Sequence, residues 1–271
     1  VDGGLTWSDP IPAAVGETYP RRETVFVTFL DRPWMAIGPD PKDPSRDNIY
    51  ITYTEFAMEY PILEEYPYIG APLVAITIKL VRSTDGGSTF SDPVAVSPTY
   101  TYLSGEEYRR IVQGSQSAVA TDGKLYVSFY DALDDGPWKG LFAPAITWST
   151  DGGRSFTKPV HMDYLYEFDY WLPSTVFRAW PSMSPRIAAG PEGNVYAVVA
   201  ANPLGPDDSD IYFSRSLDGG KTWSKSKRIN DDITTRDQAF QSIAVSRNGT
   251  IHVSFLDRRD DPADVQYHIY Y

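Results

Sequence analysis

The chain of 271 residues has no cysteine, only three histidines and no apolar run long enough to cross a membrane as a helix. The lack of cysteine excludes disulfides and thiolate metal sites, and it suits a secreted bacterial protein as well as a cytosolic one. His161, His252 and His268 share no ligand spacing, which argues against a zinc site. The first residues carry no signal-peptide pattern.

Positive charge is also scarce, because 24 Lys and Arg stand against 36 Asp and Glu and give a net charge of -12. Nucleic acid is therefore not expected as a partner, since phosphate binding needs a basic face. By contrast, 20 glycines, 22 prolines and 19 tyrosines suit a loop-rich all-β protein. No linker or low-complexity stretch divides the chain, which predicts a single domain over residues 1–271.

One short phrase recurs four times, at residues 2–7 (DGGLTW), 83–90 (STDGGSTF), 149–156 (STDGGRSF) and 216–223 (SLDGGKTW). An aspartate before two glycines suits a tight hairpin, because the carboxylate accepts turn amides and glycine tolerates φ > 0. The aromatic residue that follows can bury its ring between neighbouring sheets. The structural residues predicted in this way are Asp2, Asp85, Asp151, Asp218, Trp7, Phe90, Phe156 and Trp223.

The phrase is the Asp box, and the whole chain resembles the sialidase-like (BNR repeat) β-propellers. The resemblance implies an all-β fold, but the same box occurs in sialidases, other glycosidases, lectins and non-catalytic receptors. A full sialidase would also show an early Phe/Tyr-Arg-Ile-Pro motif. The nearest strings, YRRI at 108–111 and SPRI at 184–187, depart from that pattern, so no catalytic role transfers residue by residue.

The repeats predict a β-propeller of four-stranded antiparallel blades, with four Asp-box blades in this chain. The blades are expected at roughly 16–97, 98–160, 161–228 and 229–271 plus 1–15. When Tyr271 is set against Val1, the N-terminal strand supplies the outer strand of the last blade and closes it. The alternative is that the chain forms part of a six-bladed sialidase-type propeller.

The loops between second and third strands are long and aromatic, and they share a face with the connections between blades, which predicts the site there. Glu55, Asp131 and Asp257 end three aligned second strands. They are the candidate catalytic carboxylates of a glycosidase, one to protonate the leaving oxygen and one to stabilise or attack the anomeric carbon. Alternatively, each caps its loop by accepting backbone amides.

Trp34, Gln116 and Arg186 occupy one aligned position on the innermost strands, with Ser242 as the fourth member. Arginine outnumbers lysine in the site-face loops, and guanidinium forks suit a ligand that bears a carboxylate. Alternatively, these arginines form internal ion pairs, for which Asp31–Arg32 and Asp257–Arg258 are the expected examples. The candidate ligand-binding residues are Arg32, Trp34, Arg110, Gln116, Trp180, Arg186, Arg236 and Arg258.

These features predict a secreted or cell-surface bacterial protein that engages a glycan or glycoconjugate at the channel mouth. In its enzymatic form it is a glycoside hydrolase, in which Asp131 or Asp257 is the acid, Trp34 and Trp180 stack on sugar, and Arg186 and Arg236 hold a polar or carboxylate group. The alternative is a non-catalytic propeller that binds a glycan or a protein surface.

No cofactor is expected from the sequence. The acid-dense stretches at 131–136, 205–210 and 257–264 could offer oxygen ligands to calcium, but none has the spacing of an EF-hand loop. They suit solvated turns better, because Asp is an ordinary turn former.

Overall fold

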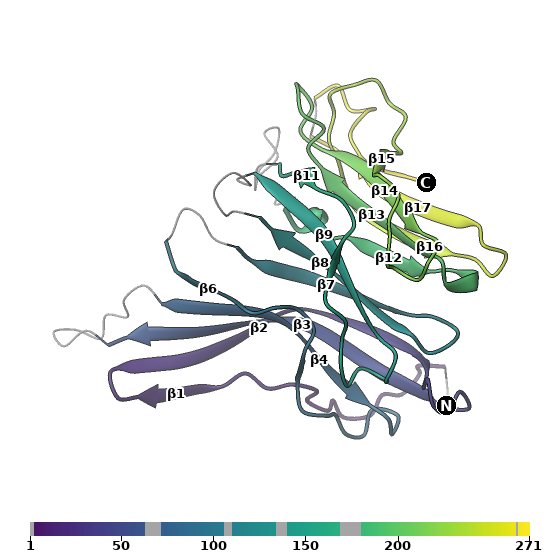
Figure 1. Cartoon of the computed structure of the whole chain (residues 1–271). Coiled ribbons are helices and arrows are strands. Elements are labelled where there is room, and N and C mark those ends of the chain that lie inside the picture. Colours follow the sequence, from purple (N-terminus) through teal and green to yellow (C-terminus); the bar gives the residue numbers. More distant parts are fainter. Residues whose placement is uncertain (1–2, 63–71, 106–109, 134–139, 169–179, 264) are drawn as a thin grey trace.

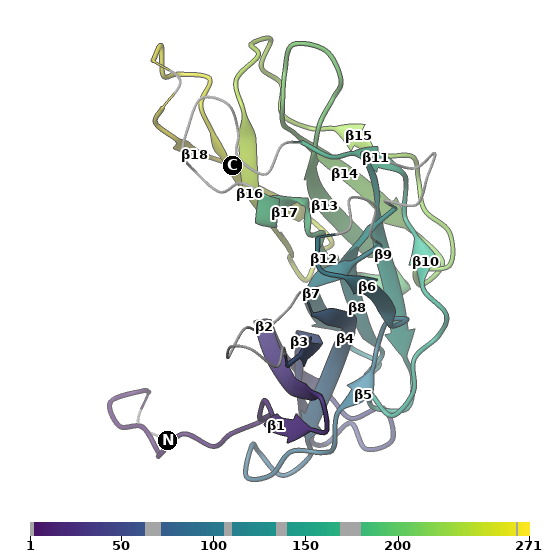
Figure 2. The same ribbon diagram turned by 90° about the vertical axis from the view of Figure 1, so that its left-hand side faces the viewer.

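The computed structural model describes residues 3–62, 72–105, 110–133, 140–168, 180–263 and 265–271. These residues form four antiparallel sheets side by side along an open arc (Figures 1 and 2). Helical structure within them is confined to the 3-10 turns η2 (Trp180–Met183) and η3 (Pro191–Gly193), and no helix is long and apolar enough to span a bilayer. The all-β prediction is confirmed.

The first two sheets form the lower and middle parts of Figure 1. The first has the order β1-β2-β3-β4-β5, with β6 also paired to β4, and the second has the order β10-β9-β8-β7, with β11 also paired to β9. The strands of the first sheet are β1 (Thr18–Arg21), β2 (Thr24–Pro39), β3 (Asp47–Pro61), β4 (Leu73–Ser83), β5 (Val94–Ala95) and β6 (Tyr100–Leu103). Those of the second are β7 (Val112–Val119), β8 (Leu125–Ala132), β9 (Leu141–Ser149), β10 (Val160–His161) and β11 (Leu165–Tyr166).

The third and fourth sheets continue the arc toward the C-terminus, with the orders β12-β13-β14-β15 and β16-β17-β18. The strands of the third sheet are β12 (Arg186–Ala189), β13 (Val195–Ala201), β14 (Asp210–Ser216) and β15 (Lys227–Arg228). Those of the fourth are β16 (Gln238–Val245), β17 (Ile251–Asp257) and β18 (His268–Tyr270). Two predicted blade limits shift, because β6 belongs to the first sheet and β11 to the second.

Neighbouring sheets pack face to face through apolar side chains, which explains why apolar residues recur at every second position of the strands. Ile78 and Leu80 of the first sheet meet Val127 and Phe129 of the second. The next two interfaces are built in the same way, around Tyr126 and Ile187 and around Val198 and Phe255. Removing these faces from water is the main stabilising contribution to the arc.

The three described Asp boxes make the same hydrogen bonds. In the box at 149–156, Asp151 Oδ1 accepts from the Ser149 hydroxyl at 2.7 Å and from the Ser155 amide at 3.0 Å, while Oδ2 accepts from the Ser155 hydroxyl at 2.6 Å. The Ser149 hydroxyl in turn accepts from the Gly153 amide at 2.8 Å. Asp85 and Asp218 repeat this pattern with their own Ser and Thr partners.

The aromatic residues of the boxes differ in burial. Phe156 packs on the core between the first and second sheets, and Trp223 packs on the core between the second and third. Phe90 is half-buried, whereas Trp7 is 89% exposed. Phe156 and Trp223 are half-buried like Phe90, so three of the four box aromatics are partly shielded from water, and Trp7 does not meet the expectation of burial.

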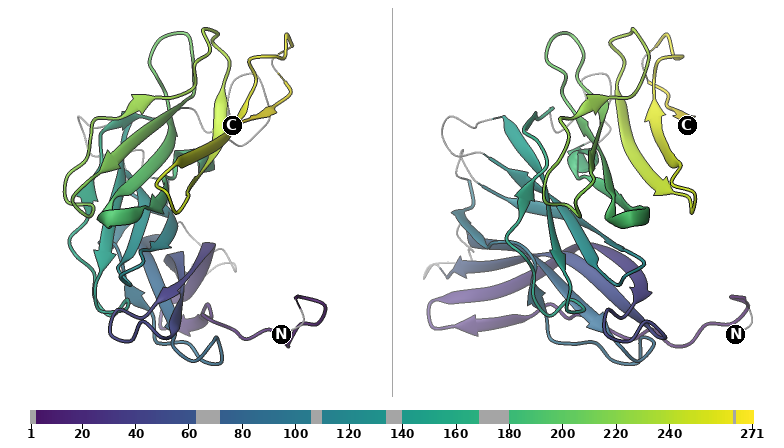
Figure 3. Two further views of the ribbon diagram at one scale, coloured as in Figure 1. Left: turned by 90° about the vertical axis from the view of Figure 1, so that its right-hand side faces the viewer. Right: turned by 45° about the vertical axis from the view of Figure 1, so that its right-hand side comes forward.

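The predicted closure by the N-terminal strand is not observed. The first sheet lies at one end of the arc and the fourth at the other, and residues 3–15 project from the first sheet on the open side of the arc without reaching the fourth sheet (Figures 2 and 3). In the described residues the fourth sheet has three strands, and the four sheets do not form a closed ring. The packing of each sheet on the next sets the angle between them, and the three angles between the four sheets leave the ends of the arc apart.

Setting Tyr271 against Val1 also aligns Tyr271 with Ser216, the residue before LDGG in the box at 216–223. This alignment is wrong by three residues. In the third sheet Val199 pairs with Tyr212, and in the fourth the aligned Phe255 pairs with Tyr270, which makes Tyr270 equivalent to Tyr212. An odd shift would turn every side chain of β18 to the opposite face. The observed register instead stacks the Tyr270 ring on Phe255, with centroids 6.3 Å apart.

Replacing Asp151 by Ala should lower the free energy of unfolding by about 1–2 kcal/mol, the cost of losing a side chain that caps several turn amides. Burial raises the pKa of Asp151, but hydrogen bonds from Ser155 and Ser149 outweigh it and lower the pKa to about 2. This contribution is therefore present above pH 4 and is lost as the pH falls toward 2. Urea titrations should show it, with the exposed Asp92→Ala as control; equal losses in both variants would contradict it.

Candidate functional site

The innermost strands of three sheets carry a β-bulge at the same place. The bulges fall between Asp31 and Trp34, between Gln113 and Gln116, and between Ala239 and Ser242. Each bulge holds one residue with positive φ, namely Arg32 at 51°, Gly114 at 67° and Phe240 at 55°. This backbone conformation is costly for Arg and Phe, and bulges of this kind re-aim side chains near functional sites.

Arg32 and Gly114 bring the first three sheets together. A Cβ atom on Gly114 would lie 2.1 Å from Ser184 Oγ and 2.6 Å from Arg32 Nη1, so only glycine fits there. The Arg32 side chain crosses this gap, and Nη1 donates to Ser184 Oγ at 2.9 Å while Nη2 donates to the Pro181 carbonyl at 3.3 Å. The close approach of β7 is therefore what lets a residue of β2 reach the third sheet.

The aligned residues Trp34, Gln116 and Arg186 lie beside this crossing. The Arg186 guanidinium carbon lies 4.9 Å from the centre of the Trp34 ring. Gln116 Oε1 accepts from the Ile187 amide at 2.7 Å, and Nε2 donates to the Ile187 carbonyl at 3.3 Å, which ties β7 to β12. We call Arg32, Trp34, Gln116, Ser184 and Arg186 the inner-strand site.

Arg186 carries the unusual electrostatics of the inner-strand site. Burial, together with the positive charge of Arg32, lowers the pKa of Arg186 to about 10. Within the described residues, its guanidinium has no carboxylate partner and no hydrogen bond, and the Trp34 ring is its contact. A partly desolvated cation beside a second cation forms a site that an anion would stabilise.

The three predicted catalytic carboxylates do not share a pocket. Asp131 and Asp257 are almost fully buried, and they lie on the faces of β8 and β17 that also carry Phe129 and Phe255. Because side chains alternate between the two faces of a strand, each of these carboxylates points into the interface with the preceding sheet and not toward the inner edge of the arc. Glu55 lies on the first sheet, where its Oε1 contacts Lys79 Nζ at 2.6 Å.

Each buried carboxylate is neutralised locally. Asp131 accepts two hydrogen bonds of 3.1 Å from Arg110, and its Oδ2 lies 3.1 Å from His161 Nε2. Asp257 Oδ2 accepts from Arg259 Nε at 2.9 Å, and Oδ1 accepts from the Arg259 amide at 2.7 Å. The two residues therefore stabilise separate inter-sheet contacts.

The other predicted arginines contact residues of the chain itself. Arg110 stacks on Tyr100, and the fully buried Arg258 pairs with Asp237 at 2.8 Å and not with Asp257 as predicted. Arg236 Nη2 donates to the Pro262 carbonyl at 3.3 Å. Asp31, the expected partner of Arg32, accepts a hydrogen bond of 2.6 Å from Gln113.

Some predicted site residues lie outside the described part. These are the side chain of Trp180, whose backbone begins η2, and segments of all four long loops, at 63–71, 106–109, 134–139 and 169–179. Asp2 of the first box is also outside it.

An acidic network between the third and fourth sheets escaped the sequence analysis. Asp210 Oδ1 forms an ion pair with Arg228 Nε at 3.1 Å and accepts a hydrogen bond from Asn230 Nδ2 at 2.6 Å, and Arg259 binds both Asp231 and Asp257. The only sequence signal is the density of acids at 205–210 and 257–264, which matches solvated turns equally well. No group of three or more His, Asp or Glu side chains in the described residues is placed to hold a metal ion.

The comparisons with known proteins concern the fold. No protein-family model matches the chain, and no curated protein matches it either. Among solved structures, an ulvan lyase of a new polysaccharide lyase family aligns with 100% of this chain and 57% of its own, at 12% identity and a TM-score of 0.55. A Hadza microbial sialidase aligns with 85% of this chain and 42% of its own, at 12% identity and a TM-score of 0.48.

The α-L-arabinofuranosidase Arb93A from Fusarium graminearum aligns with 89% of this chain and 80% of its own, at 13% identity and a TM-score of 0.46. The chain thus spans about half the length of the ulvan lyase and the sialidase. At this low identity the likeness shows the fold alone, an all-β, propeller-like arrangement of antiparallel sheets. The class that the fold defines is an all-β, propeller-like protein.

Asp207, which is buried beside Asp210, should make stability depend on pH. Burial and the charge of Asp210 raise the pKa of Asp207 to about 7. The folded state therefore binds more protons than the unfolded state between pH 4 and 7, and stability falls as the pH rises through that range. Asp207→Asn should raise the free energy of unfolding by about 1–2 kcal/mol at pH 8 and flatten the pH profile. Denaturant titrations against the exposed Asp47→Asn check this, and an unchanged slope would contradict it.

Proposed function

We propose that the protein binds an acidic glycan at the inner-strand site, with Arg186 recognising a carboxylate on the sugar. The observation that carries the proposal is the guanidinium of Arg186, which is partly desolvated, lies beside Arg32 and has no carboxylate partner in the described residues. The chain contains 36 acidic residues, which could have supplied a carboxylate partner for Arg186. A half-buried arginine without a carboxylate partner in the described residues suits an external anion.

The site has the other parts that sugar recognition requires. Trp34 remains 36% exposed, so its ring can pack against the apolar face of a sugar while its other contacts hold Arg186 in place. Gln116 is fixed by both hydrogen bonds to Ile187, which keeps the site preorganised before a ligand arrives. The carbohydrate-active structural neighbours support this class of ligand, and a secreted or cell-surface location is part of the proposal.

The second candidate function is hydrolysis of a glycosidic bond, and the observation that favours it is the contact of Asp131 with His161. The imidazole is partly exposed, and its Nδ1 lies 3.2 Å from the Tyr164 hydroxyl, so a proton could pass between the buried carboxylate and solvent. The two hydrogen bonds from Arg110 to Asp131 favour the first, non-catalytic function, because they occupy both carboxylate oxygens.

Calorimetric titration with uronate-containing, sialylated and neutral oligosaccharides tests the proposal. Arg186→Ala should weaken binding of an acidic glycan about 10- to 100-fold, the loss expected when a hydrogen bond to a charged group is removed. Arg186→Lys should recover only part of the affinity, because lysine lacks the planar fork. Arg215→Ala, an exposed arginine of the same sheet, is the control. Equal affinity for neutral and acidic glycans, unchanged by Arg186→Ala, would refute the proposal.

The same oligosaccharides, followed by mass over a day, test hydrolysis. If chains shorten, Asp131→Asn should abolish turnover and leave binding within about twofold of the unchanged protein, because the residue lies away from the carboxylate-binding arginine. An unchanged rate would remove Asp131 from the mechanism. If all masses stay constant while acidic glycans bind, the protein is the non-catalytic form of the proposal.

A further inference from the structure

Three side chains of β2 follow one another along the face that the first sheet turns toward the second. Phe29, Asp31 and Trp34 pair with every second residue of β3, from Phe56 to Thr52. Residues directly opposite one another in an antiparallel pair point to the same face of the sheet. Phe56 packs on the core between the first two sheets, which identifies that face. We call Phe29, Asp31 and Trp34 the β2 row.

The bulge of β2 keeps Trp34 in this row. Trp34 follows Asp31 by three residues, an odd step that would turn its side chain to the opposite face of a regular strand. β3 takes two residues over the same distance, so the extra residue of the bulge restores the common face. Because Thr52 and Phe56 are four residues apart in β3, the β2 row is about 13 Å long. It is therefore longer than one sugar ring.

Both ends of the β2 row are accessible to a ligand. Phe29 is 55% exposed and Trp34 36% exposed, and an exposed ring can pack on the apolar face of a sugar. Between them, Asp31 Oδ2 accepts from Gln113 Nε2 at 2.6 Å, while Oδ1 accepts no hydrogen bond from the described residues. The half-buried Asp31 thus offers a positioned carboxylate oxygen to sugar hydroxyls.

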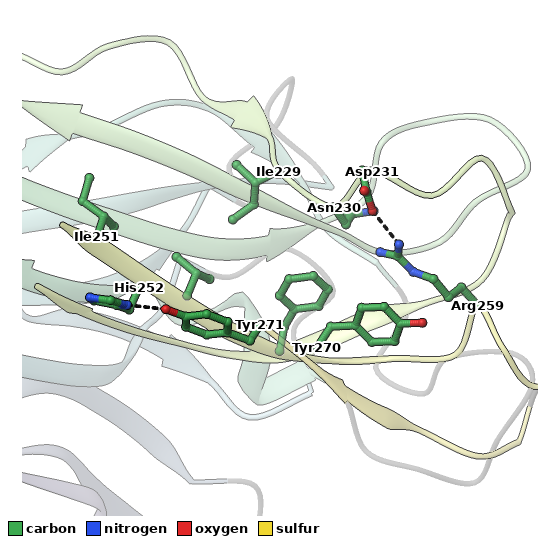
Figure 4. A pocket seen from close by; sticks show the side chains of 10 residues that line it. Ile229, Asn230, Asp231, Ile251, His252, Arg259, Tyr270 and Tyr271 are labelled. Atoms are coloured by element: carbon green, nitrogen blue, oxygen red, sulfur yellow. Dashed lines mark hydrogen bonds and ion pairs between the residues drawn. The ribbon is translucent and has the colours of Figure 1, made fainter.

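A second arginine–aromatic pair shows what a protein carboxylate does at such a place. In a pocket of about 480 Å³ between the third and fourth sheets, the Arg259 guanidinium carbon lies 4.3 Å from the centre of the Tyr270 ring (Figure 4). Figure 4 also shows the Asp231 carboxylate paired with Arg259. Asp231 takes the position beside Arg259 that, in the proposed function, an acidic sugar takes beside Arg186.

We propose that the ligand of the inner-strand site is an oligosaccharide in which the acidic sugar at Arg186 is joined to a neutral sugar that lies over Asp31 and Phe29. The inference rests on the proposed function and names the class of glycan. Arg186 and Trp34 hold the acidic sugar at one end of the β2 row. Asp31 accepts from hydroxyls of the neighbouring sugar, and Phe29 packs on its ring.

The charge of Asp31 is the reason why the second sugar is neutral. Two ionised carboxylates in contact repel, and neither can donate a hydrogen bond to the other. A sugar hydroxyl donates to a carboxylate instead, in a charge-assisted hydrogen bond that is stronger than a neutral one. Arg32, which follows Asp31, directs its guanidinium to Ser184 and Pro181. Arg186 therefore attracts one carboxylate, and Asp31 excludes a second from the next position.

Calorimetric titration with two sets of acidic compounds tests the proposal. The first set is glucuronate, glucuronate joined to a neutral sugar in either order, and a diuronate. The second set is sialic acid, sialyllactose and disialic acid. In the set that binds, the acidic–neutral compound should bind at least about 10-fold more tightly than the monosaccharide, as expected for one added hydrogen bond to a charged group. The doubly acidic compound should show no such gain.

Variants assign the gain to the β2 row. Phe29→Ala should weaken the acidic–neutral compound about 3- to 10-fold more than the monosaccharide, the loss expected for one stacking contact. Asp31→Asn should remove the preference of the acidic–neutral compound over the doubly acidic one. Leu73→Ala is the control, because Leu73 is exposed and pairs with Glu59 on the other face of the first sheet. Thermal unfolding checks that each variant is folded.

The outcomes separate this inference from the proposed function. An acidic–neutral compound that binds no more tightly than the monosaccharide overturns the inference, while the proposed function stands if Arg186→Ala still weakens binding. A gain that survives both Phe29→Ala and Asp31→Asn also overturns it, because the second sugar then lies elsewhere. If no acidic sugar binds, or if Arg186→Ala changes none of the affinities, the proposed function fails and the inference fails with it.

Discussion

Face-to-face packing of neighbouring sheets is the constraint on which the rest of this structure depends. Each strand alternates apolar residues with others, and each sheet must cover both of its faces. The two inner sheets achieve this with a neighbour on each side. The two outer sheets have one neighbour each, which leaves Met35 and Ile37 exposed at one end of the arc and Ile269 at the other. The aromatic residues of two Asp boxes, Phe156 and Trp223, are half-buried against the cores where two sheets meet.

The same packing separates structural charge from functional charge. Carboxylates at the ends of second strands point into an interface, where burial without a partner would be expensive, and Arg110 and Arg259 provide the partners. On the innermost strands the constraint is different, because the bulge of β2 places Arg32 near Arg186 of β12, and Arg186 has no acidic partner in the described residues. Arg186, the cation without a carboxylate partner in the described residues, is therefore on an innermost strand, and the neutralised acids Asp131 and Asp257 are between the sheets.

The fold was predictable to a large extent, and the site only in part. Four Asp boxes at equivalent places in the repeat predicted a propeller-like array. The alignment of the innermost strands predicted that Trp34, Gln116 and Arg186 lie near one another, as they do. The acids were misjudged, because aligned positions in different sheets share a direction relative to their own sheet and not a common target. The register of β18 was missed because an aromatic strand such as YHIYY matches its neighbours at several offsets. The packing of Tyr270 on Phe255 accompanies the register that forms.

The sequence by itself determined the local chemistry: hairpins whose carboxylate and glycines make one turn conformation, and strands whose alternation defines two faces. Both depend on residues close together in the chain, so short-range sterics and hydrogen bonding suffice. Only the tertiary structure decided which carboxylate is neutralised, which guanidinium has no carboxylate partner in the described residues, and whether the ends of the arc meet. These depend on contacts between residues far apart in sequence, such as Arg32 with Ser184, and on angles between packed sheets that no local pattern encodes.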